Sequence, residues 1–252
     1  MGVSEVLFEL GAPERYEIVR FLASGEKRPS EIASKLRLTR SDTSRHLARL
    51  CKAGLAEKSV NGYASTMVGH VVVRYSSSLE FFLKNHDYFK THMWEILPES
   101  LLSRIYALRE AILHEGVTHT LKMVDDAIKS SREYLLVVLS EVPFYLVPSV
   151  LGRLTENVAV KLALTPMAIE HVTQFFKENP QYNPDLLKKA TIRVIDSCFA
   201  CTAINEKVAG TNLINREKPH EHFSSHFIGE SPTFREWCKD VYELHEARAR
   251  PT

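Results

Sequence analysis

The sequence predicts two folded parts of different class, an α+β domain at the N-terminus and an α/β domain that follows it after a helical linker. Three observations predict this organisation. Residues 10–66 show three short helical patterns followed by two β-prone runs around an Asn-Gly pair. Residues 68–93 repeat apolar side chains at helical spacing, and residues 134–196 alternate apolar β-rich runs with helix-compatible stretches. We place the domain boundaries at 1–66, 67–94 and 95–252.

Length and composition are typical of an intracellular globular protein. The chain has 252 residues, of which 44% are hydrophobic and 25% are charged. No apolar run approaches the roughly 20 residues that a helix needs to cross a bilayer, and Glu5 and Glu9 stand where a secretory signal would carry Lys or Arg. Four cysteines in so long a chain do not form a disulfide framework. We therefore expect a cytoplasmic protein with no membrane partner.

Positive charge is concentrated between residues 27 and 58. This stretch holds nine Lys and Arg residues against three Asp and Glu residues, a local net charge of +6, whereas the whole chain carries only +1. The nine are Lys27, Arg28, Lys35, Arg37, Arg40, Arg45, Arg49, Lys52 and Lys58. A polyanionic partner such as nucleic acid should therefore contact the N-terminal domain first.

Three helices are predicted before the first turn signal. The first covers residues 10–23 and ends at Gly25. The second is short and begins with Ser30 as its cap. The third begins at Thr39, and Asp42 three residues later completes a capping-box pattern.

The third helix has two different faces. Thr43, Leu47 and Leu50 are spaced at i, i+4 and i+7, so they share the buried face. The opposite face is short, polar and basic, and it carries Ser41, Ser44, Arg45 and Ala48. A helix that enters the major groove of DNA needs an outward face of this kind, with basic residues beside it to neutralise phosphate.

A β-hairpin is predicted after the third helix. Gly54 ends the helix, and two short β-prone runs flank Asn61-Gly62, a strong hairpin signal. Three helices followed by such a hairpin make a winged helix-turn-helix domain, whose partner is double-stranded DNA. The expected contacts are Thr39, Arg40, Ser41, Ser44, Arg45, Arg49, Lys52, Lys58 and Asn61. Two alternatives are a basic face that is merely solvated and a module that docks protein or RNA.

The segment SDTSRHLARLCKAGLAEK resembles the ArsR-like winged-helix regulators, whose recognition helix carries the signature S-R-H-L-x-x-L-x-x-A-G-L. The resemblance covers about residues 8–66 and implies a transcription regulator that binds DNA. The cysteine pair of the metal-sensing members is missing, because only Cys51 lies on this helix. The arsenic- or cadmium-responsive mode is therefore not implied.

An apolar seam follows the hairpin. Its residues alternate spacings of four and three over about three and a half heptads, which is typical of a helix that pairs with another helix. They are Val68, Val72, Tyr75, Leu79, Phe82, His86, Phe89 and Met93. We expect this helix to join two copies of the chain in a homodimer. The alternative is that the seam packs against the chain's own C-terminal domain.

The C-terminal half alternates strands and helices. Strands are predicted at 134–142, 158–165 and 191–196, with helices around 144–155 and 167–178, so the sheet is parallel or mixed. A hairpin over 198–215 and an amphipathic helix over 234–250 close the domain.

Ligands of open α/β sheets bind at the carboxyl ends of the strands. The polar residues that end the three predicted strands are Ser140, Glu141, Thr165 and Asp196. We expect these residues to bind a small-molecule effector, although each residue type is also common in turns and caps.

The segments LPESLLSRIYALREA and FIGESPTFREWCKDVYELH resemble the regulatory domain of archaeal winged-helix proteins of the filamentation and methanogenesis regulator (FilR) type. The resemblance covers about residues 85–246 and implies a phospholipase-D-like fold that senses a small molecule. Phospholipase-D catalysis needs His and Lys two residues apart, and the sequence contains no H-x-K. We therefore predict no catalytic residues, no cofactor and no enzyme activity. A DNA-tethered phosphodiesterase-like enzyme is the alternative.

Two further groups could sense redox state or metal. Cys198 and Cys201 form a single C-x-x-C, and on a strand their side chains would point to opposite faces, so we expect buried structural cysteines. His220, His222 and His226 are expected in a solvated loop. No metal ligand is assigned. A redox- or metal-responsive regulator that uses one of these groups remains an alternative.

Overall fold

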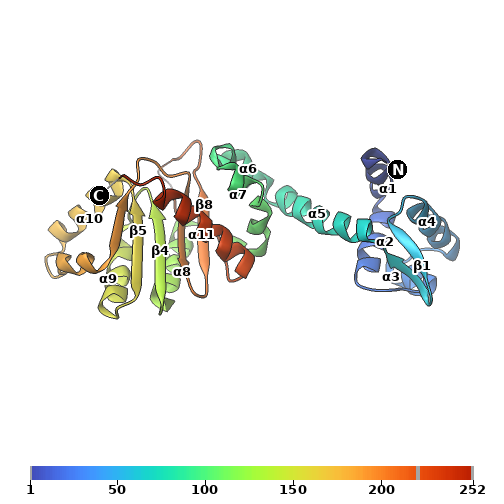
Figure 1. Ribbon diagram of the computed structural model, residues 1–252, viewed down its shortest axis with the longest axis horizontal. Helices are drawn as coiled ribbons and strands as arrows, with labels where there is room; N and C mark the ends of the chain where they lie inside the picture. The colour runs from blue at the N-terminus through green and yellow to red at the C-terminus, as the bar shows by residue number, and fades with distance from the viewer. Residues whose placement is uncertain (1, 220–221, 251–252) are drawn as a thin grey trace. The chain divides into compact units, whose positions relative to one another are not determined.

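Two units of different architecture, Met1–Lys84 and Asn85–Thr252, make up the structure (Figure 1). It is a computed structural model, and it describes residues 2–219 and 222–250. The helical N-terminal part and the C-terminal α/β part predicted from the sequence are both present. Among the described residues, no helix has both the length and the apolar composition needed to cross a bilayer.

The first unit contains five helices and a two-stranded hairpin among its described residues. They are α1 (Val3–Leu10), α2 (Pro13–Ala23), α3 (Pro29–Leu36), α4 (Arg40–Lys52), β1 (Ala56–Ser59), β2 (Gly62–Ser65) and α5 (Met67–Lys84). Aliphatic side chains from α2, α3 and α4 form its core, including Ile18, Leu22, Ile32 and Leu47. Helix α1 was not predicted. The next helix was predicted to start at residue 10, but α2 starts at Pro13.

The caps explain where the short helices begin. The prediction that Ser30 caps the second helix is wrong, because α3 already starts at Pro29, whose fixed φ suits the first helical position. The backbone N–H of Arg28 donates to the Glu31 carboxylate at 2.6 Å. The predicted cap of the third helix is confirmed, since Thr39 Oγ1 accepts from the backbone N–H of Asp42 at 3.0 Å.

The hairpin is held against the loop before α3, within the first unit, by a close approach of the two backbones. Ser59 pairs with Gly62, so the turn consists of Val60 and Asn61. Lys27 and Tyr63 exchange two backbone hydrogen bonds of 2.9 Å. A Cβ at Gly62 would overlap the carbonyl of Lys27, so this position needs a residue without a side chain.

The predicted single helix over residues 68–93 is wrong. Helix α5 ends at Lys84, and a separate short helix, α6 (His86–Thr91), belongs to the second unit. Val72 of α5 packs against the core of the first unit. Tyr75 and Leu79, also in the predicted seam, are 70% and 59% exposed.

A seven-stranded mixed sheet forms the centre of the second unit, in the order β3-β9-β8-β7-β4-β5-β6. Strands β4, β5 and β6 are parallel, and the other pairings are antiparallel. The strands are β3 (Ile112–Glu115), β4 (Tyr134–Leu139), β5 (Ala159–Leu164), β6 (Thr191–Val194), β7 (Ala200–Asn205), β8 (Ala209–Leu213) and β9 (Ser225–Gly229). The three parallel strands and the β7–β8 hairpin were predicted; β3 and β9 were not.

Helices cover both faces of this sheet. Helices α8 (Val117–Ser130), α9 (Val147–Thr155) and α10 (Pro166–Glu178) pack on one face around an aliphatic core. Helix α11 (Pro232–Glu246) crosses the other face (Figure 1). The shorter elements are α7 (Glu99–Leu102), η1 (Trp94–Ile96), η2 (Ile105–Glu110), η3 (Phe144–Leu146) and η4 (Pro184–Lys189).

Candidate nucleic-acid interface and effector pocket

Helix α4 separates an apolar underside from a polar outer face. Thr43, Leu47 and Leu50 are buried beneath it, as their spacing predicts. The residues of its outer face and of the wing that were predicted to contact DNA are all exposed to solvent: Thr39, Arg40, Ser41, Ser44, Arg45, Arg49, Lys52, Lys58 and Asn61. The helix can therefore present these side chains to a partner without disturbing the core of the unit.

The N-terminal end of α4 carries its own carboxylate. Thr39 Oγ1 donates to Asp42 Oδ2 at 2.7 Å, and Arg45 forms an ion pair of 2.6 Å with the other oxygen of Asp42. The Arg45 side chain is 67% exposed. Exposed ion pairs contribute about 1 kcal/mol or less, so Arg45 can leave Asp42 for a base or phosphate at small cost.

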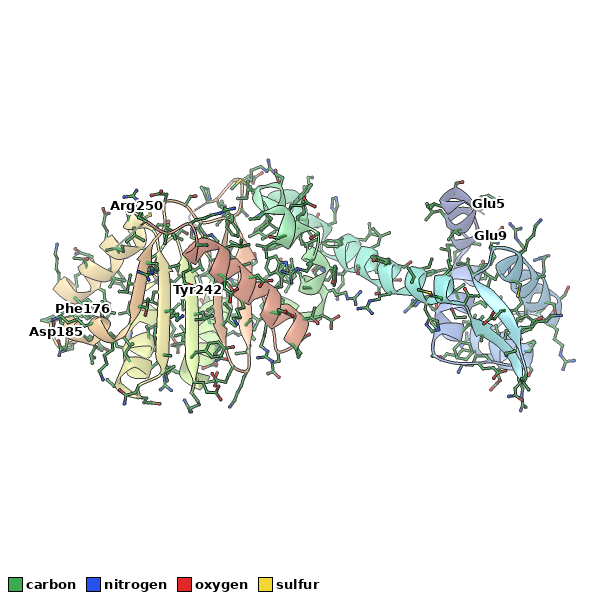
Figure 2. All side chains as sticks on the ribbon, viewed as in Figure 1. Glu5, Glu9, Phe176, Asp185, Tyr242 and Arg250 are labelled. Carbon is green, nitrogen blue, oxygen red and sulfur yellow. The ribbon has the colours of Figure 1, made fainter. Side chains whose placement is uncertain are left out.

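The C-terminal end of α4 is covered by a second carboxylate, which comes from α1. Arg49 Nε and Nη2 donate to the two oxygens of Glu9 at 2.9 and 2.8 Å. Arg15 lies 2.9 Å from the same carboxylate, and Glu9 is labelled in Figure 2. The hydrogen bond from Arg49, with the charge of Arg15, holds the pKa of Glu9 below its ordinary value. Arg49 would have to leave Glu9 to contact phosphate, which the sequence did not predict because α1 was not recognised.

The wing is fixed to the preceding loop by another acidic residue. The carboxylate of Glu26 accepts from the backbone N–H of Asn61 at 2.6 Å and from the hydroxyl of Ser59. The hydrogen bond from Ser59 lowers the pKa of Glu26. Because the turn is anchored in this way, Asn61 and Lys58 occupy a defined position beside the hairpin rather than a free loop.

The four predicted effector residues meet in one pocket of the second unit, which has a volume of about 340 Å³. Its other lining residues are Pro166, Met167, Cys198, Ile214, Pro219 and His222. The pocket lies where β4, β5 and β6 end and where β7 begins, so strand direction alone brings Ser140, Thr165 and Asp196 to the same edge. A volume of this size is at the lower end for small-molecule sites.

Hydrogen bonds position these residues. Thr165 caps α10 by accepting from the backbone N–H of Ala168 at 3.2 Å, and its hydroxyl donates to the carbonyl of Ser140 at 2.6 Å. Asp196 accepts from Arg250 Nε at 2.6 Å, and Arg250 is labelled in Figure 2. The pocket therefore has an ordered polar wall, in which the carboxylate of Asp196 already has a cationic partner.

The prediction that Cys198 and Cys201 point to opposite faces of a strand is wrong. Their sulfur atoms are 3.7 Å apart. Only Cys201 lies on β7, whereas Cys198 lies in the loop before it, so the alternation of a strand does not apply to the pair. Cys198 is partly exposed and lines the pocket, and Cys201 is fully buried behind it.

The solvated loop predicted for the histidines is also wrong for the two that the structure describes; His220 lies outside the described residues. His222 and His226 are only 4% and 3% exposed. His222 Nε2 is 2.7 Å from the hydroxyl of Ser140. His226 lies on the previously unrecognised strand β9, and burial lowers its pKa to about 4. Its Nδ1 atom is buried without a hydrogen-bond partner among the described residues.

The two thiols have opposite electrostatic environments. Burial and the hydrogen bond to Cys201 raise the pKa of Cys198 well above its ordinary value. Hydrogen bonds from Cys198 and His222 hold the pKa of Cys201 well below it, although burial acts in the other direction. Burial also opposes protonation of His222, but its hydrogen bond with Cys201 raises the pKa of the imidazole. Within the described residues, no three His, Cys, Asp or Glu side chains are arranged to hold a metal ion.

Three solved structures are similar to the chain at low sequence identity. TrmBL2, described as an archaeal chromatin protein with a novel mode of DNA binding, is 14% identical; the match covers 96% of this chain and 94% of TrmBL2, with a TM-score of 0.44. Nuc, a phospholipase D family member from Salmonella typhimurium, is 11% identical over 56% of this chain and 97% of Nuc, with a TM-score of 0.41. The methyltransferase SibL is 14% identical over 75% of this chain and 61% of SibL, with a TM-score of 0.27. TM-scores this low carry no conclusion about fold or function, so the phospholipase-D-like fold stays a prediction.

A family model is more specific for the first unit. No curated protein matches the sequence. Residues 12–58 match the model of the bacterial regulatory protein, arsR family, and this segment runs from the start of α2 into β1. The segment includes all of α4 and its cap. The first unit therefore contains an arsR-type helix-turn-helix domain, which is the DNA-binding module of transcription regulators.

Proposed function

We propose that the protein is a dimeric transcription regulator that binds a specific DNA sequence through α4. The observation that carries the proposal is the capped helix α4, whose exposed face is polar and basic while its leucines are buried beneath it. A recognition helix needs this division, because its outer side chains must reach base edges while its underside holds it to the domain. The family match over residues 12–58 supports the same role.

The exposed residues of α4 divide into two classes of contact. Arg40, Ser41, Ser44 and Arg45 are placed on the first half of the helix to reach bases or nearby phosphates. Arg49 and Lys52 on its last turn, together with Lys58 of the wing, suit the sugar–phosphate backbone. In this account, phosphate replaces Glu9 as the partner of Arg49 when DNA binds.

The second copy of the chain is proposed to pack on α5. Five apolar side chains recur every three or four residues along this helix and are at least 41% exposed: Val68, Val71, Tyr75, Leu79 and Leu83. A stripe of this spacing is one face of a helix. Pairing the α5 faces of two chains would bring two copies of α4 into one dimer, so that they could occupy half-sites about 34–36 Å apart.

The second unit is proposed to bind a small-molecule effector in the pocket lined by Ser140, Glu141, Thr165 and Asp196. The support is that these residues, which end three strands, share one pocket of about 340 Å³ at the edge of the sheet where α/β proteins bind ligands. The FilR-type resemblance agrees with this role. Effector binding would shift the dimer between arrangements that differ in operator affinity.

Selection of duplexes from a random DNA library tests the regulator function. The full-length protein should enrich one sequence with two similar half-sites, and binding should weaken steeply as salt is raised because phosphate contacts release counterions. Analytical ultracentrifugation of the complex should find two chains per duplex. Failure to enrich any sequence, or equal affinity for selected and scrambled duplexes, would contradict the proposal.

A further inference from the structure

The cysteine pair of the second unit is not explained by the proposed function. An effector pocket needs polar groups that orient a ligand, but it does not need two thiols within 3.7 Å of each other. The sulfur of Cys201 is also 3.7 Å from the hydroxyl of Ser140, which in turn contacts His222. Two thiols, a hydroxyl and an imidazole thus form one hydrogen-bonded chain, in which Ser140, Cys198 and His222 line the pocket and Cys201 lies behind them.

The pair is arranged so that one sulfur is accessible and the other is protected. Cys198 lines the pocket, whose rim residues Pro166, Met167 and Pro219 are exposed. Cys201 is 0% exposed and is held by β7. A disulfide requires a sulfur–sulfur distance of about 2.05 Å. Cys198 lies in the loop before the strand, so this loop can bring it toward Cys201 without breaking the sheet.

We propose that Cys198 and Cys201 are a reversible oxidation site for hydroperoxides, with Cys198 as the attacking sulfur and Cys201 as the resolving sulfur. The pocket admits a small oxidant to Cys198. Cys201 is fully buried, so it reacts with the oxidised sulfur of Cys198 and not with the oxidant itself. His222 is the positioning residue that holds and returns the proton. This chemistry does not depend on whether the first unit binds DNA.

The reaction balances with hydrogen peroxide as the oxidant. The Cys198 sulfur attacks one peroxide oxygen while its proton passes to Cys201; the O–O bond breaks, an S–O bond forms, and the leaving hydroxide takes the proton of the His222 imidazolium to become water. His222 then takes the proton from Cys201, whose sulfur attacks Cys198. The S–O bond breaks, and the second hydroxide recovers this proton from His222. Two thiols and one peroxide give one disulfide and two waters, so the sulfurs supply both electrons.

The environment favours this chemistry at the pair over the other cysteines. The thiolate is the reactive form of cysteine, and Cys198 has a base beside it: the hydrogen bonds from Cys198 and His222 hold the pKa of Cys201 below its ordinary value, so Cys201, 3.7 Å away, can take the proton of Cys198 as it attacks. Cys51 is similarly half-buried on α4 and burial raises its pKa, but it is the single cysteine of residues 1–84, so no second thiol of its unit can take its proton. Cys238 is fully buried in α11. These two cysteines therefore serve as internal controls.

Tryptic peptide mapping of the full-length protein after exposure to hydrogen peroxide tests the proposal. Cleavage after Lys and Arg places Cys198 and Cys201 together in residues 194–207, Cys51 in residues 50–52 and Cys238 in residues 236–239. The 194–207 peptide should lose two hydrogens about tenfold faster than the Cys51 peptide reacts, because the Cys201 thiolate beside Cys198 takes its proton during the attack and then resolves the product. Dithiothreitol should restore it. A 194–207 peptide that stays reduced while Cys51 oxidises would overturn the proposal.

Two variants assign the roles of the residues. In Cys201→Ser, a 1,3-dione should trap sulfenic acid at Cys198, more slowly because the acceptor of its proton is gone, and no disulfide should form; no trapping at Cys198 would refute its assignment as the attacking sulfur. In His222→Gln, disulfide formation should slow. As the pH is lowered, its rate should begin to fall at a higher pH than in the wild type, because the imidazole no longer lowers the pKa of Cys201. An unchanged pH profile in a variant that melts at the wild-type temperature would refute the role of His222.

Discussion

The two units place their functional side chains in opposite environments. On α4, Arg45 is exposed and held by a single surface ion pair with Asp42. At the carboxyl edge of the sheet, Cys201, His222 and His226 are almost fully buried. The difference teaches that substitutions on the outer face of α4 should change binding with little effect on folding. Substitutions behind the pocket should change folding and chemistry together, because buried polar groups depend on their partners.

Replacement of Leu47 by Ala gives the largest expected effect and tests the claim that α4 has a structural and a binding face. Leu47 is 1% exposed in the core of the first unit. Truncation should lower the free energy of unfolding by about 2–5 kcal/mol through lost burial and the cavity left behind. Ser44→Ala on the outer face of the same helix is the matched control and should change it by about 0.5 kcal/mol or less. Urea denaturation of both variants decides, and similar losses would erase the distinction between the faces.

The pH dependence of stability tests the buried environment of the second unit. Burial lowers the pKa of His226 to about 4, below its ordinary value of 6.5. The unfolded chain therefore binds more protons than the folded chain between these values, so the stability from neutral His226 is complete above pH 6.5 and is lost as pH falls toward 4. The loss should reach about 3 kcal/mol. Denaturant titrations should show a flatter profile for His226→Gln, and identical profiles would contradict this assignment.

Arg45→Ala tests whether the exposed unit acts through bases. If Arg45 contacts a base, its loss should weaken binding to the selected duplex by about 1–3 kcal/mol and leave binding to a scrambled duplex nearly unchanged. Lys239→Ala is the matched control, because Lys239 also pairs with a carboxylate one turn away, Glu243, but lies on α11. Equal weakening on both duplexes would instead assign Arg45 to phosphate.

Glu9→Gln gives the smallest expected effect, and it should raise DNA affinity where Arg45→Ala lowers it. Removing this carboxylate frees Arg49 from its two hydrogen bonds to α1, so affinity for any duplex should rise by about 1 kcal/mol or less. The salt dependence should also steepen, since one more cation reaches phosphate. Glu17→Gln, which removes the exposed ion pair with Arg20 on α2, should leave affinity unchanged. A gain as large in the control would show that net charge alone is responsible.

Local sequence signals predicted the features that short sequence spacings or strand direction determine. Thr39, Asp42 and Leu47 define the start and faces of α4 through spacings of three to five residues, and the structure has both features. Ser140 and Thr165 were predicted to lie together because parallel strands end at the same edge. These inferences needed only helix geometry and strand direction.

Features that depend on strand order were not predicted. His226 lies on β9, whose sequence does not alternate polar and apolar residues. Ser225 and His226 are buried by neighbouring elements, so no pattern in the sequence indicated a strand here. Cys198 and His222 reach the pocket only because β9, β8 and β7 bring their loops beside β4. The helix α1 was missed because it is only eight residues long and its apolar side chains do not mark one buried face. Val6 and Leu10 pack against the core of the first unit, whereas Val3, Leu7 and Phe8 are exposed.

The most direct test of the account is DNA cleavage from the outer face of α4. A Ser44→Cys variant carrying a tethered iron chelate that cuts DNA should be bound to its selected duplex, with the wild-type protein treated by the same reagent as the control. The account predicts cuts confined to the major groove at the centre of each half-site, absent from the control. Cleavage spread evenly along the duplex, or no cleavage by a variant that still binds, would contradict the placement of α4 in the groove.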